Sequence, residues 1–210
     1  VLATGVRPRG VDFPGADHEK VVGYLDVLEG RVVPGANVAI IGAGGIGFDV
    51  AEFLVHEGPS PTLDPARWMA EWGIDPGYDA RGGLQRPEPE PPARKLWLLQ
   101  RSECKPGARL GKTTGWIHRA TLKQKGVKAL GGVQYLGVDD AGLRIRAEGR
   151  ERTLAVDHVV VCAGQEPRRE LLEAVRRMGL DPHLIGGADV AAELDAKRAI
   201  DQGSRLAARL

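Results

Sequence analysis

The feature that most constrains this chain is an apolar run that ends in closely spaced glycines. Residues 37–41, Asn-Val-Ala-Ile-Ile, have the composition of a buried strand, and apolar residues recur at helical spacing over residues 46–54. In the G-x-G-x-x-G pattern between them, the first glycine allows a tight turn, the second lets the backbone approach a diphosphate, and the third lets the helix pack on the strand. The sequence predicts a dinucleotide site at Gly42, Gly44, Gly45 and Gly47; the alternative is a glycine-rich turn without a ligand.

The helix that follows the glycines would direct the positive end of its dipole at the phosphates. Asp49 is expected in the first turn of this helix, where its carboxylate would complement the dipole. A second role stays open for Asp49, namely a polar contact near the nicotinamide end of the dinucleotide.

The composition is that of a globular chain of 210 residues, enough for one large domain or for one domain and part of another. Its 29 basic and 28 acidic residues give a formal net charge of +1, which argues against nucleic acid or a membrane as a partner of a basic surface. No segment resembles a membrane span or a signal peptide, so a cytoplasmic protein is expected. Cys104 and Cys162 lie far apart without metal-ligand spacing, which argues against a disulfide framework or a zinc site.

Two segments of the chain repeat one another. Residues 1–9 align without gaps on residues 160–168, with Val, Gly, Pro and Arg at the same offsets, and each copy is an apolar strand that runs into a glycine and a proline. The repeat predicts two sheets, although chance similarity of two strand exits is the alternative. Because Val1 opens directly into an apolar strand, we expect a fragment in which residues 1–30 and 165–210 belong to a second domain and residues 31–164 form a nucleotide-binding domain.

The second parallel strand of that domain is expected at residues 95–100, which leaves a long insertion at residues 58–94. Trp68 and Trp72 lie one helical turn apart in the insertion and are expected to anchor it; stacking on a ligand is the alternative. The pattern of residues 105–128 is polar and helical, and its expected buried side chains are Trp116, Ile117, Ala120 and Leu122.

A β-meander is predicted after this helix, over residues 133–138, 143–147 and 152–156, and it leads into a parallel strand at residues 158–162. One more strand at residues 184–185 and a helix over residues 191–210 complete the pattern. The fold class is therefore α/β, a Rossmann-like parallel sheet with a β-meander, flanked by segments of a second domain.

The identity of the cofactor depends on the residue at the end of the second strand, since a carboxylate there holds the ribose of NAD and an arginine accommodates the 2′-phosphate of NADP. That strand ends at Arg101, with Lys105 close behind and no carboxylate before Glu103, which favours NADPH. A solvated arginine at the strand end is the alternative. Asp64 has the spacing of an NAD residue but lies in the insertion and is rejected, and a proton-transfer role for His118 is the less favoured interpretation.

Several longer motifs resemble those of a known family. They are NVAIIGAGGIGFDVA, KLWLLQR, KPGARLGKTTGWIHRATL, VDHVVVCAGQEPRRE and HLIGGADVAAELDAKRAI, and together they cover nearly the whole chain. These segments are similar to the C-terminal part of bacterial NADPH-dependent 2,4-dienoyl-CoA reductases, which belong with the trimethylamine dehydrogenase-like flavoproteins. The resemblance implies an NADPH-binding domain together with the segments that enter and leave an FAD-binding domain.

The resemblance also assigns residues. The glycine turn corresponds to the diphosphate site, Arg101 to the 2′-phosphate position, and Ala163 and Gly164 to the strand exit beside the nicotinamide. Thr4, Gly5, Gly187 and Asp189 correspond to FAD-contacting segments, with Asp189 as the ribityl contact. FMN and a [4Fe-4S] cluster belong to the full-length proteins of that family, and their ligands have no counterpart here.

The resemblance implies that NADPH passes a hydride to FAD and that the whole protein reduces a 2,4-dienoyl-CoA in unsaturated fatty acid oxidation, with the remainder of its own flavoenzyme as partner. The fragment alone is expected to be inactive. Two alternatives stay open: a structural ADP-holding domain like that of the amine dehydrogenases, and an NADPH-flavin reductase that acts on another enone or a quinone.

Overall fold

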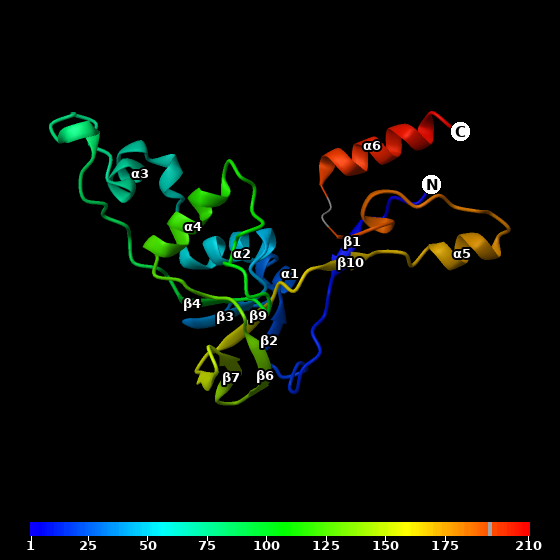
Figure 1. Cartoon of the computed structure of the whole chain (residues 1–210), viewed down its shortest axis with the longest axis horizontal. Coiled ribbons are helices and arrows are strands. Elements are labelled where there is room, and N and C mark those ends of the chain that lie inside the picture. Colours follow the sequence, from blue (N-terminus) through cyan, green and yellow to red (C-terminus); the bar gives the residue numbers. More distant parts are fainter. Residues whose placement is uncertain (193–194) are drawn as a thin grey trace. The chain divides into compact units, whose positions relative to one another are not determined.

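The computed structural model describes residues 1–192 and 195–210. The chain forms two compact units, one of Val1–Gly10 with Ala163–Leu210 and one of Val11–Cys162 (Figure 1). The boundaries predicted from the sequence lie at residues 30 and 164. The difference concerns residues 11–30, which contribute a strand and a helix to the larger unit, and residues 163–164, which belong to the smaller unit.

The larger unit is built on a five-stranded sheet in which every neighbouring pair is parallel. Its strands, in spatial order, are β2 (Val21–Gly23), β9 (His158–Val161), β3 (Asn37–Ile41), β4 (Lys95–Leu99) and β5 (Lys128–Leu130). The glycine-terminated strand β3 is central, and the second strand predicted from the sequence, β4, lies directly beside it. A mixed α/β fold with a parallel Rossmann-like sheet is thus confirmed.

Both faces of this sheet are covered. One face packs against α1 (Tyr24–Leu28), α2 (Gly45–Val55) and α4 (Gly115–Gln124), and Val38, Ile40 and Leu98 are fully buried beneath them. Figure 1 shows α2 and α4 on one side of β3 and β4, with β6 and β7 on the other side. Burial on both faces explains why β3 is almost continuously apolar rather than alternating.

The predicted meander is present as an antiparallel three-stranded sheet of β6 (Gln134–Asp139), β7 (Gly142–Ala147) and β8 (Arg150–Leu154). Between β7 and β8, Glu148 and Gly149 have φ angles of 52° and 72°. Positive φ at both central residues is the requirement of a two-residue type I′ hairpin. Because this turn is so short, the third strand occupies residues 150–154 rather than the predicted 152–156.

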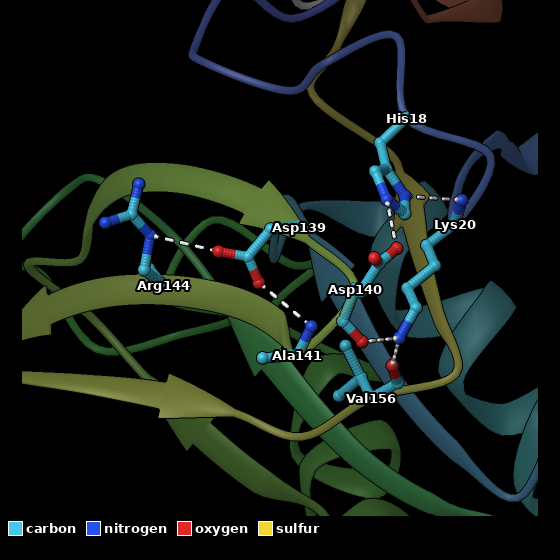
Figure 2. Close-up of polar contacts among 7 residues, drawn as sticks. All are labelled: His18, Lys20, Asp139, Asp140, Ala141, Arg144 and Val156. Atoms are coloured by element: carbon cyan, nitrogen blue, oxygen red, sulfur yellow. Dashed lines mark hydrogen bonds and ion pairs between the residues drawn. The ribbon is translucent and has the colours of Figure 1, made fainter.

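The segment before β2 is fastened to the meander by polar contacts (Figure 2). His18 Nε2 lies 3.2 Å from Asp140 Oδ1. Lys20 Nζ donates to the carbonyl oxygens of Asp140, at 2.7 Å, and Val156, at 3.1 Å. These contacts join residues more than one hundred positions apart, and they explain why residues 11–20 belong to the larger unit.

The insertion at residues 58–94 contains η1 (Pro61–Leu63), α3 (Pro65–Trp72) and η2 (Arg81–Gly83). Trp68 and Trp72 pack on each other with ring centroids 6.3 Å apart, and the Trp68 side chain stays partly exposed. The insertion is held to the domain by a buried ion pair, in which Lys125 Nζ lies 2.7 Å from Glu71 Oε1. No pattern in the sequence predicts this pair.

Helix α4 is shorter than the sequence predicted, since it begins at Gly115 and ends at Gln124. Leu122 is buried as expected, but Trp116 is 59% exposed and Ile117 is 37% exposed. The prediction that these two side chains are buried was wrong. The helix instead packs through Gly115 and Leu122, and the Trp116 indole donates to the carbonyl of Thr113.

The smaller unit contains β1 (Val6–Pro8) and β10 (Gln165–Pro167), which pair antiparallel. In the two repeated segments, these strands follow the shared glycines Gly5 and Gly164 and end at the shared prolines Pro8 and Pro167. Leu2 forms a parallel bridge with Leu184, and the remaining elements are α5 (Leu172–Arg177), η3 (Gly186–Ala188) and α6 (Ala196–Ala207). The expected C-terminal helix thus starts at residue 196, and residues 193–194 of that prediction lie outside the described residues. None of the described helices combines the length and the apolar character that crossing a membrane requires.

Candidate dinucleotide site

The glycine turn leaves β3 in a conformation that demands glycine. Gly42 has a φ of 115°, and its amide donates to the carbonyl of Leu99 at 2.7 Å, which ties the turn to the end of β4. A Cβ atom at Gly47 would lie 1.8 Å from the Gly42 carbonyl oxygen, so a side chain there cannot be accommodated without a shift of the turn. These two glycines meet the steric roles that the pattern predicted.

The other two glycines of the turn face open space. Neither Gly44 nor Gly45 has a heavy atom within 4 Å of the position that a Cβ would occupy. The first backbone bond of α2 is donated by Phe48 to Gly44, at 3.0 Å, and the N-cap residue Gly44 has no side chain with which to accept the other amides of the first turn. The amides before Phe48 therefore lack acceptors within the helix, and they form an exposed N-terminus suited to an anion.

Asp49 does not complement this helix end as expected. The first turn of α2 contains no acidic residue, because α2 starts at Gly45 and Asp49 falls one turn further on. The Asp49 side chain is exposed. The favourable effect of a carboxylate on the dipole falls off beyond the first turn, so this prediction was wrong.

Arg101 lies at the same edge of the sheet as the glycine turn. The register of β3 and β4 pairs Ile41 with Leu99, so the glycines follow one strand where Arg101 follows the other. Arg101 and Lys105 are both exposed. The Asp64 carboxylate, rejected as an NAD residue, caps α3 by accepting the amides of Ala66 and Arg67.

The loop after β4 is fixed at its start by backbone bonds to the segment that follows β5. The amide of Val133 donates to Gln100 at 3.0 Å, and the amide of Gly132 donates to Ser102 at 2.9 Å. Cys104 lies exposed in this loop, and hydrogen bonds with Ser102 and Gln100 lower the pKa of its thiol. Cys162 is buried, which raises its pKa to about 12.

The middle of the same loop touches the glycine turn itself. The Gly107 amide donates to the Ala43 carbonyl at 3.3 Å, and Arg119 Nη1 from α4 donates to the Gly107 carbonyl at 3.0 Å. Neither Gly107 nor Arg119 was predicted from the sequence as a site residue. The only available signal was the position of Gly107 within the motif KPGARLGKTTGWIHR, which carries no spacing rule of its own.

His118 joins two helices. Its Nδ1 lies 2.8 Å from Glu52 Oε1, so the pair links α4 to α2. Both side chains are about one-third exposed or less. The pair gives His118 a structural partner, in agreement with the interpretation that its role is structural rather than one of proton transfer.

The remaining predicted residues belong to the smaller unit. Gly5 and Gly187 line one pocket of about 460 Å³, together with Ala3, Ile185, Gly186, Asp195, Ala196 and Ala199. The Thr4 hydroxyl donates to the Arg168 carbonyl, and Asp189 Oδ2 accepts from Gln202 Nε2 at 2.6 Å. Gly164, which follows Ala163, has a φ of 102°, and its carbonyl accepts the Arg9 amide at 2.9 Å.

The chain belongs to the pyridine nucleotide-disulphide oxidoreductase family, whose sequence profile matches residues 1–194. Membership of this flavoprotein oxidoreductase family implies binding of FAD and a pyridine nucleotide. The glycine turn of the larger unit suits the diphosphate of such a ligand, since no heavy atom lies within 4 Å of the Cβ positions of Gly44 and Gly45. The pocket of the smaller unit offers a second concave site, lined in part by Gly5, Gly186 and Gly187.

Individual relatives are distant. A metal reductase of Desulforamulus reducens is 27% identical over 186 residues, which are 84% of this chain and 25% of that protein. A probable ferredoxin reductase of Castellaniella defragrans is 26% identical over 209 residues, 95% of this chain and 40% of that protein. The chain thus spans less than half the length of these curated relatives.

Solved structures show the same fold. A 2-naphthoyl-CoA reductase matches with a TM-score of 0.70 at 21% identity, over 99% of this chain and 26% of its own. A 6-hydroxypseudooxynicotine amine oxidase of Pseudomonas geniculata N1 matches with a TM-score of 0.68 at 21% identity, over 97% of this chain and 27% of its own.

Proposed function

We propose that this chain is the NADPH-binding part of a flavin-dependent reductase, in which NADPH supplies a hydride to FAD. The observation that carries the proposal is the position of Arg101, exposed just beyond β4 and beside the open glycine turn. A guanidinium there matches the 2′-phosphate of NADPH, and no carboxylate precedes Glu103 to hold the ribose of NADH.

The proposal extends to the whole protein as a 2,4-dienoyl-CoA reductase with FMN and a [4Fe-4S] cluster outside this chain. This extension rests on the resemblance of the motifs around the glycine turn, the KPGARLGKTTGWIHR segment and the CAGQEP strand exit. The two curated relatives are also named as reductases. The remainder of the same flavoenzyme is the proposed partner, and the cytoplasm is the proposed location.

Titration of the 210-residue chain with NADPH and NADH tests the cofactor. A charge-assisted contact contributes about 1.5–3 kcal/mol, so NADPH is expected to bind roughly ten- to a hundredfold more tightly. Arg101→Ala is expected to reduce NADPH affinity to that of NADH and to leave NADH binding unchanged. Arg150, exposed on the meander, serves as the matched control through Arg150→Ala.

Equal affinities for the two cofactors, unchanged in Arg101→Ala, would rule out the assignment of NADPH. Retention of ADP through purification, with no response to either nicotinamide cofactor, would favour the structural ADP-holding alternative. An assay of the full-length protein with a dienoyl-CoA separates the proposed substrate from another enone or a quinone.

A further inference from the structure

The peptide group between Ala43 and Gly44 has its carbonyl and its amide in different surroundings. The carbonyl of Ala43 accepts a hydrogen bond from Gly107, as described above, while the amide of the same peptide belongs to Gly44. Because a peptide group is planar and trans, its C=O and N–H point in opposite directions. A contact that fixes the Ala43 carbonyl therefore also fixes the direction of the Gly44 amide.

The Gly44 amide lies where the turn is open to a ligand. No heavy atom outside the turn lies within 4 Å of the position that a Cβ at Gly44 would occupy, and the second glycine of the pattern is the one that approaches the diphosphate. A free peptide group at a glycine can rotate at little cost, since glycine tolerates a wide range of backbone angles. A partner for the Ala43 carbonyl would remove that freedom before the ligand arrives.

Gly107 is itself held on three sides. Its φ of 74° favours glycine, and a Cβ there would lie 2.6 Å from the Phe48 ring of α2. Its carbonyl accepts from the half-buried Arg119, and a hydrogen bond from a charged donor is stronger than one between neutral groups. Arg119, Gly107 and Ala43 thus form a continuous chain of contacts from α4 to the turn.

We infer that Arg119, acting through Gly107, is a positioning residue that orients the Gly44 amide toward the cofactor diphosphate. This inference rests on the proposed dinucleotide binding. It differs from the role of Arg101, because both NADPH and NADH carry the diphosphate and only NADPH carries the 2′-phosphate.

The affinities of the two cofactors separate these roles. Arg119→Met is expected to weaken NADPH and NADH binding by the same factor, roughly ten- to a hundredfold for one misdirected hydrogen bond to a charged group. The ratio of the two affinities stays at its wild-type value, whereas Arg101→Ala changes that ratio.

Arg94→Met is the matched control for the arginine. Arg94 is also half-buried and also donates to backbone carbonyls, those of Pro34 at 3.1 Å and Leu54 at 3.2 Å, away from the glycine turn. Arg94→Met is expected to lower the free energy of unfolding about as much as Arg119→Met does, while leaving the affinities for NADPH and NADH unchanged. A loss of cofactor affinity in Arg94→Met equal to that in Arg119→Met would overturn the inference, because general destabilisation would then explain both.

Gly107→Ala provides a second variant. Its control is Gly126→Ala, because Gly126 has a similar φ of 71° but open space at its Cβ position. The first substitution is expected to weaken both cofactors and the second to leave them unchanged. Equal binding by the two variants would contradict the inference.

Amide NMR of the unliganded chain measures the orientation of the Gly44 amide through its chemical shift, which a change in stability alone does not alter. The Gly44 amide resonance is expected to shift in Arg119→Met and to remain in place in Arg94→Met. An unmoved Gly44 resonance together with wild-type affinities would overturn the inference while leaving the proposed cofactor intact. A wild-type chain that binds neither nucleotide would instead remove the proposed function on which the inference rests.

Discussion

Asp157 connects the starts of two neighbouring strands of the larger unit. Its Oδ2 accepts the backbone amide of Asn37 at 2.7 Å and the Asn37 side-chain amide at 3.4 Å, which joins the residue before β9 to the first residue of β3. These hydrogen bonds favour the charged carboxylate, and the bond from the Asn37 backbone is the main reason why the pKa of Asp157 is lowered.

The lowered pKa predicts how stability depends on pH. The folded-state pKa lies below the unfolded value of about 3.9, so the stabilisation is fully present above that value and is lost as the pH falls through the folded pKa. Asp157→Asn is therefore expected to destabilise the chain at pH 7 and to lose less stability than wild type between pH 5 and pH 3. Urea unfolding at these pH values measures both effects.

The exposed Asp79 offers a control through Asp79→Asn, which is expected to leave the pH profile unchanged. A wild-type profile in Asp157→Asn would mean that these bonds contribute nothing to acid sensitivity.

The insertion illustrates how an element far from the glycine turn is fixed to the domain. The side chains of Lys125 and Glu71 are only 4% and 8% exposed, and Lys125 Nζ also donates to the Glu90 carbonyl at 3.1 Å. The pair thus fastens both α3 and the later part of the insertion to the residue that follows α4. A buried pair contributes little net stability, but loss of one partner leaves an uncompensated charge.

Lys125→Met is expected to destabilise the chain by about 3–5 kcal/mol, because Glu71 would remain buried without its partner. The double substitution Glu71→Leu and Lys125→Met is expected to recover most of that loss. Denaturant unfolding of the single and double variants measures the two free energies. If the double variant were as unstable as the single one, packing rather than the unpaired charge would be responsible.

At the scale of the whole molecule, burial is distributed unevenly. All of the largest fully buried side chains of the described residues belong to the larger unit, Ile40 and Leu98 among them. Among the described residues of the smaller unit, the buried apolar side chains are Leu172 and Ala188, and α6 buries none of its residues. Local stability follows the number of buried apolar contacts.

Amide hydrogen exchange is therefore expected to separate the two units. Amides of β3, β4 and β9 should be the most protected, and those of α5 and α6 should exchange faster, because little apolar surface is buried around them. Exchange of the full chain followed by mass spectrometry of its peptides measures this. Equal protection of α6 and β3 would contradict the expectation.

The sequence alone determined the features that depend on neighbours along the chain. The strand, glycine turn and helix at residues 37–55 were predictable because their signals are local: β-branched residues, glycine spacing and helical periodicity. The meander was predictable for the same reason, since its strand patterns are short and glycines at positions 142 and 149 separate them. The position of Arg101 followed from recognising β4 as a short apolar strand.

Only the tertiary structure decided which distant residues meet. Residues 11–30 join the larger unit because β2 pairs with β9, a strand more than one hundred residues later. Trp116 and Ile117 are exposed because the boundaries and packing of α4 determine which of its faces meets the sheet. Gly107 contacts the glycine turn from a loop whose sequence has no periodicity, and Arg119 of α4 contacts Gly107. The pairing of β2 with β9 and of Gly107 with Ala43 joins residues far apart in the sequence, and such pairing becomes visible only when the sheet and its helices are assembled.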